Sequence, residues 1–319
     1  MLGLKEKYRD YFKIGACVSP RTIVTHADLL KKHFNSLTCE NAMKYVSLCR
    51  EPGKYTFDAA DRIYQFAKDN DMAVHGHTFV WHNQTPDFIF DTESPEETMR
   101  AHMKLVAERY GAQCNAWDVA NECIEDKSDA YYRNTKWYQA YGENYLDRFF
   151  VMARELLPKH IKLYYNDYNE AHPLKREKIY QLVKGMKERG VPVDGIGMQS
   201  HHNLYVPGIE DIRRAIERYA ELGVTLQVTE MDVSVFAFED RSSIPAPTKE
   251  LMERQAEFYE RCFEIYREYK GIIESVTLWG IADDVTWLDG FPVPGRKNWP
   301  LLFDVNHQPK EAFHRIMNF

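Results

Sequence analysis

Two glutamates follow short apolar segments of the sequence directly. Glu122 comes after Ala116–Ala120 and Asn121, and Glu230 comes after Val224–Thr229. If the fold brings the two carboxyl groups together, one can hold a proton while the other stays negatively charged, and general acid–base and nucleophilic catalysis need both forms. Taken singly, either glutamate could instead be a solvated surface charge.

Other polar and aromatic side chains, among them carboxylates, amides, imidazoles and indoles, follow other apolar segments in the same way. They are Glu40, Asn41 and Lys44; His75, His77, Trp81 and His82; Asn166 and Asp167; Gln199, His201 and His202; and Trp279, Asp283, Asp284 and Trp287. Carboxylates and amides hydrogen-bond hydroxyl groups, and indole faces can stack on the apolar faces of sugar rings. No GxGxxG or P-loop motif follows a strand. These side chains therefore suit a neutral, polyhydroxylated ligand.

Eight short apolar or β-rich segments recur along the chain and alternate with helical patterns. They are Lys13–Val18, Phe34–Cys39, Ala73–Phe79, Ala116–Ala120, Lys162–Asn166, Val193–Gln199, Val224–Thr229 and Ser275–Leu278. Such alternation favours a parallel sheet with crossover helices, and about 40 residues per unit fits an α/β fold of the (β/α)8 TIM-barrel type. An open doubly wound sheet is the alternative. In a barrel the carboxyl ends of the strands form one cleft, so the polar residues above would share a site.

Amphipathic patterns predict the helices between these strands. The first, Asp58–Asn70, would place Ala59, Ile63, Phe66 and Ala67 on one face. A capping box with proline at the first helical position, Ser94–Glu97, begins the next. Its predicted core stripe is Met99, Met103, Val106 and Tyr110, with Gly111 as the C-terminal cap. Further helices are predicted at Lys175–Arg189, Ile209–Leu222 and Lys249–Tyr269.

The composition limits the number of domains and the kinds of partner that the chain can have. The 319 residues contain no low-complexity tract, repeat or linker, so we expect a single domain over residues 1–319 without an appended binding module. Lys and Arg number 41 against 48 Asp and Glu, and the net charge of −7 argues against nucleic-acid or anionic-membrane partners. No run of 18 apolar residues occurs, so no membrane span is expected.

The N-terminus and the cysteines indicate a compartment. The first twenty residues are charged and lack an apolar signal-peptide core, which predicts a cytoplasmic protein. None of the six cysteines has CxxC spacing, so a zinc ribbon or a thioredoxin motif is excluded. Six reduced thiols are expected. An even count would still allow disulfides if a signal had been removed.

Ordered blocks over nearly the whole chain resemble glycoside hydrolase family 10, the endo-β-1,4-xylanases. The blocks are Cys39–Lys44, Gly76–His82, Trp117–Glu122, Asn166–Asn169, Gly195–His201, Val228–Asp232, Trp279–Gly280 and Pro300–Asp304. One block alone would be weak evidence for the family, whereas the complete set in this order is specific for it. The resemblance implies a retaining endo-1,4-β-xylanase without a cofactor or catalytic metal, with xylan or xylo-oligosaccharide as substrate.

The resemblance also implies residue roles. Glu122 would be the general acid/base and Glu230 the nucleophile, with the carboxyl groups roughly 5–5.5 Å apart. The charge on Glu230 disfavours a second charge at Glu122, which therefore keeps its proton until Glu230 is esterified. His201 and Asp232 would support the nucleophile, although His201 could be only a buried strand-end histidine. Asn121 would reach the 2-hydroxyl of the reacting sugar, although it could instead cap the following loop.

The substrate-binding residues follow from the same comparison. They are Glu40, Asn41, Lys44, His77, Trp81, Gln199, Tyr168, Trp279 and Trp287. Xylose lacks the hydroxymethyl group of glucose, so a cleft walled by Trp279 and Trp287 could exclude hexoses. For each aromatic residue, core packing is the alternative, and Tyr168 is the weakest candidate of the set.

Three other functions are weighed against this one. His75, His77, His82, His201 and His202 could serve a metal-dependent barrel hydrolase, but the paired glutamates explain these positions without a metal. A retaining glycosidase acting on glucan or mannan would use the same carboxylates. A sugar-binding protein without catalysis is disfavoured, because both glutamates are present. In its expected location, and in the expected absence of a carbohydrate-binding module, the chain resembles the intracellular branch of the family. That branch acts on imported oligosaccharides.

Overall fold

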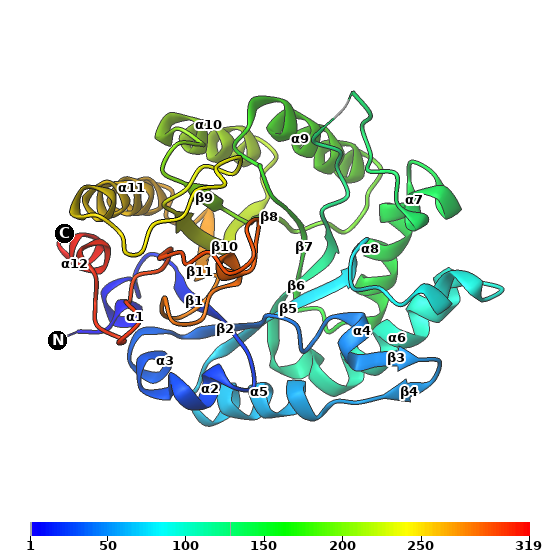
Figure 1. Cartoon of the computed structure of the whole chain (residues 1–319). Coiled ribbons are helices and arrows are strands. Elements are labelled where there is room, and N and C mark those ends of the chain that lie inside the picture. The colour runs from blue at the N-terminus through cyan, green and yellow to red at the C-terminus, as the bar shows by residue number, and fades with distance from the viewer. Residues whose placement is uncertain (1, 128) are drawn as a thin grey trace.

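Eight parallel strands close into a barrel in the computed structural model, which describes residues 2–127 and 129–319. The strands are β1 (Lys13–Val18), β2 (Ser36–Cys39), β5 (Ala73–Val80), β6 (Cys114–Asn121), β7 (Lys162–Asp167), β8 (Gly195–Met198), β10 (Thr225–Ser234) and β11 (Ile273–Leu278). Their order is β11-β1-β2-β5-β6-β7-β8-β10, and β10 pairs with β11 to close the ring (Figure 1). The predicted (β/α)8 barrel is confirmed, and the open sheet is excluded.

Helices surround this barrel (Figure 1). They are α1 (Leu4–Lys7), α2 (Thr22–Thr25), α3 (Ala27–His33), α4 (Tyr45–Leu48), α5 (Asp58–Asp69), α6 (Pro95–Tyr110), α7 (Lys136–Tyr141), α8 (Tyr145–Leu156), α9 (Pro173–Glu188), α10 (Ile209–Ala220), α11 (Lys249–Glu268) and α12 (Glu311–Met317). Short 3-10 turns are η1 (Asp87–Asp91), η2 (Gly111–Gln113) and η3 (Trp287–Asp289). Three short strands lie at the margins: β3 (Cys49–Glu51) pairs with β4 (Lys54–Tyr55), and β9 (His201–Asn203) pairs with β10.

The start of α6 forms as predicted, whereas its end differs. The Ser94 hydroxyl accepts the Glu97 N–H at 3.2 Å, and Pro95 occupies the first helical position. The four residues of the predicted core stripe are buried. Gly111 terminates the helix with φ −56°, so it does not use the left-handed conformation that makes glycine a common cap. Its hydrogen instead leaves room for Pro158, which would lie 2.9 Å from an added Cβ.

Two details of the other predicted elements were wrong. On α5 the buried face carries Ala60 and Tyr64 with Ile63 and Ala67, whereas Ala59 is exposed. The strand predicted to end at Thr229 continues to Ser234. All positions from Leu226 to Ser234 are buried, and β9 extends the sheet beside Asp232–Ser234, the last part of β10. Glu230 and Asp232 therefore project from a paired strand rather than from a free loop.

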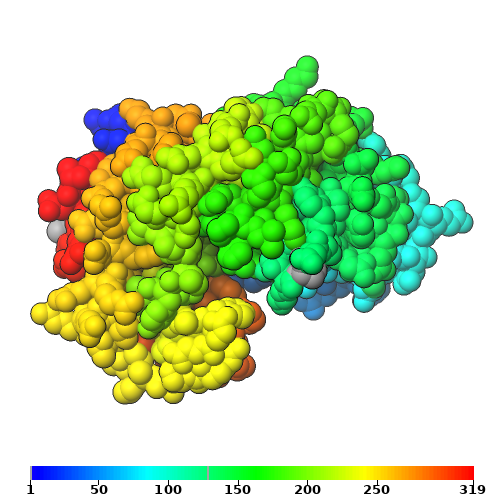
Figure 2. Space-filling model, turned by 90° about the horizontal axis from the view of Figure 1, so that it is seen from above, coloured from blue at the N-terminus to red at the C-terminus, as the bar shows by residue number. Residues whose placement is uncertain are grey.

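The segment between β10 and α11 projects from the body of the molecule, as the yellow region of Figure 2 shows. It contacts the segment that follows β11. Arg296 Nη1 donates to the carbonyl of Asp240 at 2.6 Å, and the rings of Phe238 and Phe291 are 5.8 Å apart. The two loops that follow β10 and β11 therefore support one another beside the barrel mouth.

Two further expectations concern the cysteines and the membrane-spanning helices. All six cysteines are buried and free. Within the described residues, no helix is both long and apolar enough to cross a bilayer.

Gly76 provides a test of the barrel packing. A Cβ at this position in β5 would lie 2.2 Å from the Trp117 ring, which is buried and stacked on Phe79 at 4.5 Å. We expect Gly76→Ala to lower the free energy of unfolding by about 1–3 kcal/mol, measured by urea denaturation. Gly290→Ala, whose nearest neighbour would be 3.5 Å away, is the control, and equal loss in both variants would contradict the packing argument.

Candidate active site

The two glutamates lie at the same end of the barrel. Glu122 comes directly after β6, and Glu230 lies in the last half of β10. Only β7 and β8 separate these strands around the ring. The structure therefore brings together two carboxyl groups that are 108 residues apart in sequence.

Side-chain amides join the two carboxyl groups. Gln199 Nε2 donates to Glu122 Oε1 and to Asn121 Oδ1, both at 3.1 Å. Asn166 Nδ2 donates to the same Asn121 oxygen at 2.9 Å and to Glu230 Oε1 at 2.7 Å. Each carboxylate thus accepts a hydrogen bond from an amide, and the two amides share one acceptor. We call Asn121, Asn166 and Gln199 the amide bridge.

Glu230 is held in its charged form. Burial alone would raise the pKa of its carboxyl group, but the hydrogen bond from His201 and the charges of His77, His201 and Lys44 lower the pKa below its usual value. The His201 Nε2 atom is 3.4 Å from Glu230 Oε2, and Nδ1 is 3.0 Å from Asp232 Oδ2. Asp232 therefore orients the imidazole toward Glu230.

His201 is a cation in this arrangement. Burial would lower its pKa, but the charge and hydrogen bond of Asp232, followed by those of Glu230, raise the pKa from 6.5 to about 10. The neighbouring His202 faces the opposite situation. Burial and the charge of His201 lower the pKa of His202 to about 3, so it is neutral.

A second buried charge cluster lies beneath the site. His75 Nε2 and His77 Nδ1 each contact one oxygen of Asp118 at 2.9 Å. Burial would raise the pKa of Asp118, but the charge and hydrogen bond of His75 and the hydrogen bond and charge of His77 lower it. Asp118 thereby fixes the His77 ring, which packs edge-on against Trp279 with centroids 5.6 Å apart.

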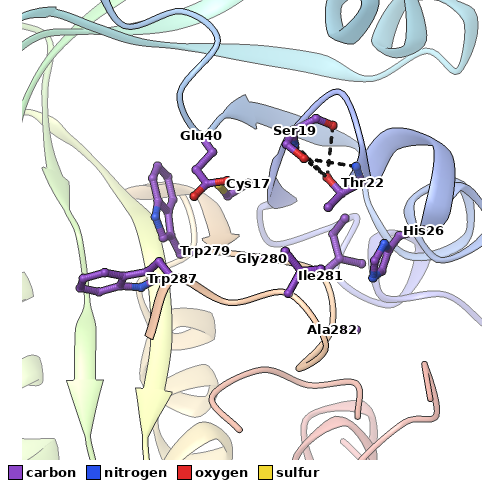
Figure 3. Close-up of a pocket in the computed structure, with 11 residues that line it drawn as sticks. Cys17, Ser19, Thr22, His26, Glu40, Trp279, Gly280, Ile281, Ala282 and Trp287 are labelled. Atoms are coloured by element: carbon purple, nitrogen blue, oxygen red, sulfur yellow. Dashed lines mark hydrogen bonds between the residues drawn. The ribbon is translucent and has the colours of Figure 1, made fainter. Parts of the chain in front are cut away.

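Predicted substrate-binding residues that follow β2 contact one that follows β5. Lys44 Nζ donates to Asn41 Oδ1 at 3.2 Å and lies 4.8 Å from the Trp81 ring centroid. Burial lowers the pKa of Lys44, whereas the charge of Glu230 raises it. Glu40 lines a small pocket with two tryptophans, which Figure 3 shows facing it across the gap.

Those two indoles, Trp279 and Trp287, lie against the catalytic candidates. Trp287 Nε1 donates to Asp232 Oδ2 at 2.7 Å, and its ring centroid is 4.9 Å from that of His201. Trp279 lies 6.2 Å from the same imidazole. Trp279 is buried and Trp287 is half-buried, so both support the site besides lining it.

The backbone of Glu122 is fixed in an uncommon conformation. Its φ is +57°, in the left-handed region that glutamate rarely occupies. Its N–H donates to the Asn166 carbonyl at 2.9 Å, and its carbonyl accepts from Arg133 Nε at 3.1 Å. Tyr165 Oη then accepts the N–H groups of Cys123 and Ile124 at 3.1 and 3.2 Å.

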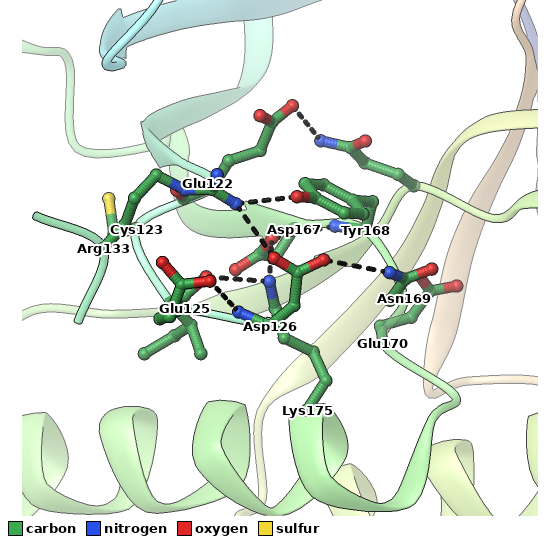
Figure 4. Close-up of polar contacts among 12 residues, drawn as sticks. Glu122, Cys123, Glu125, Asp126, Arg133, Asp167, Tyr168, Asn169, Glu170 and Lys175 are labelled. Carbon is green, nitrogen blue, oxygen red and sulfur yellow. Dashed lines mark hydrogen bonds and ion pairs between the residues drawn. The ribbon is translucent and has the colours of Figure 1, made fainter. Parts of the chain in front are cut away.

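Lys175 and Asp167 anchor this turn from below, as Figure 4 shows. Tyr165 donates to Asp167, and the buried Lys175 Nζ lies 2.9 Å from Asp167 Oδ1 and donates to the Ile124 carbonyl at 2.9 Å. Tyr168 accepts from Arg133 Nη2 at 2.7 Å. Tyr168 therefore lies on the Glu122 side of the cleft.

We predicted no specific role for two residues of the site. Asn166 was included among the strand-end polar residues because it belongs to an Asn-Asp pair after an apolar segment, and its bond to Glu230 from the end of β7 was not predicted. Arg133 ties Tyr168 to Glu122 from an irregular segment before α7, where no sequence pattern marks it. The predicted site residues lie at or after the ends of seven barrel strands, β2, β5, β6, β7, β8, β10 and β11, which the closed barrel brings to one rim.

Comparison with known proteins assigns this arrangement to a family. The family model described as Glycosyl hydrolase family 10 matches residues 3–319. The chain belongs to glycosyl hydrolase family 10. It is similar to endo-1,4-beta-xylanase A of Caldicellulosiruptor saccharolyticus, with 49% identity over 100% of this chain and 96% of the relative. Endo-1,4-beta-xylanase B of Paenibacillus barcinonensis is 50% identical over 99% of this chain and 97% of the relative.

A solved structure supports the same membership. A glutamate-to-alanine mutant in complex with xylotriose superposes with a TM-score of 0.97 at 46% identity, covering 100% of both chains. The family 10 chain is therefore a glycoside hydrolase. The histidines weighed above for a metal hydrolase have other contacts: His75 and His77 contact Asp118, and His201 lies between Glu230 and Asp232.

The charge on His201 generates a test in solution. We expect nitrogen NMR to show a doubly protonated His201 imidazole at about pH 8, with the proton lost only as the pH rises through about 10. His202, with a pKa near 3, is the internal control and should stay neutral throughout. Asp232→Asn should lower the pKa of His201, and a neutral His201 at about pH 7 in the unmodified enzyme would contradict the charge assignment.

Proposed function

We propose that this enzyme is a retaining endo-1,4-β-xylanase in which Glu230 is the nucleophile and Glu122 is the general acid/base. The observation that carries the proposal is the amide bridge between two strand-end glutamates, one of which is buried and paired with a cationic histidine. The endo-1,4-beta-xylanase names of relatives at 49% and 50% identity support the substrate class.

The first half-reaction uses the two carboxyl groups together. The Glu230 oxygen bonds to the anomeric carbon as the glycosidic C–O bond breaks, and Glu122 gives its proton to the departing oxygen. The product is a covalent glycosyl ester of Glu230 with inverted configuration at the anomeric carbon. Asn121 donates toward the 2-hydroxyl of the reacting sugar, a contact that strengthens as positive charge develops on the ring.

The second half-reaction reverses the role of Glu122. Esterification removes the charge on Glu230, so the now ionised Glu122 can accept a proton from water. The water oxygen bonds to the anomeric carbon, the ester bond breaks, and Glu230 leaves as a carboxylate. Two inversions restore the original configuration. His201 favours this departure because its positive charge stabilises the released carboxylate.

Polar and aromatic side chains along the cleft select the sugar. Glu40, Asn41 and Lys44 offer acceptors and donors to ring hydroxyls before the cleavage point, and Gln199 and His77 face the reacting sugar. Trp279 and Trp287 leave less room for a hexose, with its hydroxymethyl group, than for xylose. Trp81 lines the same part of the cleft, and Tyr168 stacks on the leaving-group side. A related structure that holds xylotriose is consistent with this preference.

We further propose that the substrate is short xylo-oligosaccharide, hydrolysed in the cytoplasm after import. Six buried, free cysteines support a reducing compartment, in which thiols persist. Fractionation of the native host tests the location. Recovery of the enzyme from the cell interior is expected, and recovery from the medium would overturn this part of the proposal.

The mechanism predicts a stereochemical result. Proton NMR during digestion of xylohexaose should show β-anomers of shorter oligomers first, before mutarotation. Glu230→Ala and Glu122→Ala should each lower kcat by about a thousandfold or more, because each removes one member of the pair. Glu239→Ala, at an exposed position, is the matched control. Early α-anomer would mean inversion and would exclude Glu230 as nucleophile.

Sugar preference is tested separately. The kcat/KM for an aryl xylobioside should exceed that for an aryl cellobioside by about tenfold or more, the scale expected when a pocket rejects one extra group. Replacing Trp287 by alanine should reduce this ratio, because the wall that meets the hydroxymethyl group is removed. Equal rates on both substrates would contradict the steric argument and favour a broader β-glycanase.

A further inference from the structure

A cluster of two histidines and one aspartate lies apart from the two glutamates. His26 lies between α2 and α3, Asp284 lies in the segment after β11, and His307 lies in the turn before α12. One ligand atom from each of these residues can be chosen such that all three lie within 4.8 Å of one another. Three segments far apart in sequence thus present metal-binding atoms to one point.

Asp284 lies between the two imidazoles. Its Oδ1 is 2.9 Å from His26 Nε2, and its Oδ2 is 3.5 Å from His307 Nε2. The side chain of His26 is only 1% exposed, whereas those of Asp284 and His307 are 29% and 34% exposed. The cluster is therefore anchored in the protein on one side and reachable from solvent on the other.

The second ring nitrogen of His26 has its own partner. His26 Nδ1 lies 2.7 Å from Thr25 Oγ1, and that hydroxyl can donate to the Arg21 carbonyl at 3.3 Å. With Nδ1 donating to Thr25, the lone pair of Nε2 points toward Asp284 and is available to a cation. Metal-binding histidines are commonly oriented by a hydrogen bond of this kind at the other nitrogen.

His307 and Asp284 lie on segments that local hydrogen bonds and an ion pair hold in place. His307 has φ +62°, and its turn is held by Asp304, whose Oδ1 accepts the N–H groups of Asn306 and Gln308 at 2.8 and 2.9 Å. Asp283, beside Asp284, contacts Lys310 Nζ at 2.9 Å. Binding would therefore require little rearrangement of the backbone.

The placement of the Asp284 carboxyl group suits a cation. One of its oxygens faces the His26 ring and the other faces the His307 ring. A cation bound between the two rings would replace the imidazole protons that otherwise face this carboxyl group.

We propose that His26, Asp284 and His307 form a binding site for a divalent transition-metal ion of the zinc class. Two imidazole nitrogens and one carboxylate oxygen are a ligand set that zinc accepts, with water completing a four-coordinate shell. Imidazole ligands favour zinc over magnesium and calcium, which prefer oxygen.

The bound ion would hold in place the segment that carries Trp279 and Trp287. In the sequence, Asp284 lies between Trp279 and Trp287. The small pocket of Figure 3 is lined by both indoles at one end and by His26 at the other. The ion would join this segment to α2, α3 and the C-terminal turn. It takes no part in bond cleavage, so xylan hydrolysis continues after chelation.

Calorimetric titration of the chelator-treated enzyme with zinc chloride tests the proposal. We expect one site per chain and a rise in Tm of about 5 °C at a hundredfold excess over Kd. His307→Gln should abolish both effects, whereas His314→Gln, which removes an exposed histidine of α12, should retain them. Circular dichroism of both variants verifies folding.

Cobalt(II) provides a second readout that is independent of stability. Visible absorption typical of four-coordinate cobalt should develop with the unmodified enzyme and with His314→Gln, and should be lost in Asp284→Asn and His307→Gln. Absence of a zinc site in the unmodified enzyme would overturn the proposal. Zinc binding that His307→Gln leaves unchanged would also overturn it, because the ion would then be held by other surface groups.

Discussion

Two carboxyl groups that share one cleft must be kept in opposite protonation states, and the architecture of the site depends on this constraint. Like charges about 5 Å apart repel by about 3 kcal/mol at an effective dielectric constant of about 20. The protein assigns the permanent charge to Glu230 by pairing it with His201. Among the described residues, the side-chain amides of Gln199 and Asn121 donate hydrogen bonds to the Glu122 carboxyl group.

The barrel makes this assignment possible because it brings strand ends to one rim at fixed spacing. The Asn121 oxygen meets Asn166 and Gln199 only when β6, β7 and β8 are adjacent and in register. Behind the rim, buried charges orient the groups of the proposed active site. Asp232 orients the His201 imidazole, and Lys175 with Asp167 supports the turn that carries Glu122.

Much of this could be predicted from the sequence, and the remainder has physical reasons. Strand and helix periodicity identified all eight barrel strands, because each unit buries its own apolar stripe. The extension of β10 beyond Thr229 was missed because it depends on pairing with β9, a non-local contact. Family resemblance pointed to Glu122 and Glu230, whereas the bridging role of Asn166 emerges only when three strands are adjacent. Arg133 lies in an irregular segment, where no periodicity exists.

Covalent trapping tests the central claim most directly. A 2-deoxy-2-fluoro xylobioside with a good leaving group should form the glycosyl ester quickly and hydrolyse it slowly, because fluorine destabilises both oxocarbenium-like transition states. Peptide mass spectrometry should then find one sugar adduct per chain, on the peptide that contains Glu230. An adduct on Glu122 or on another residue would contradict the account. Inverted product formed without an adduct would contradict it as well.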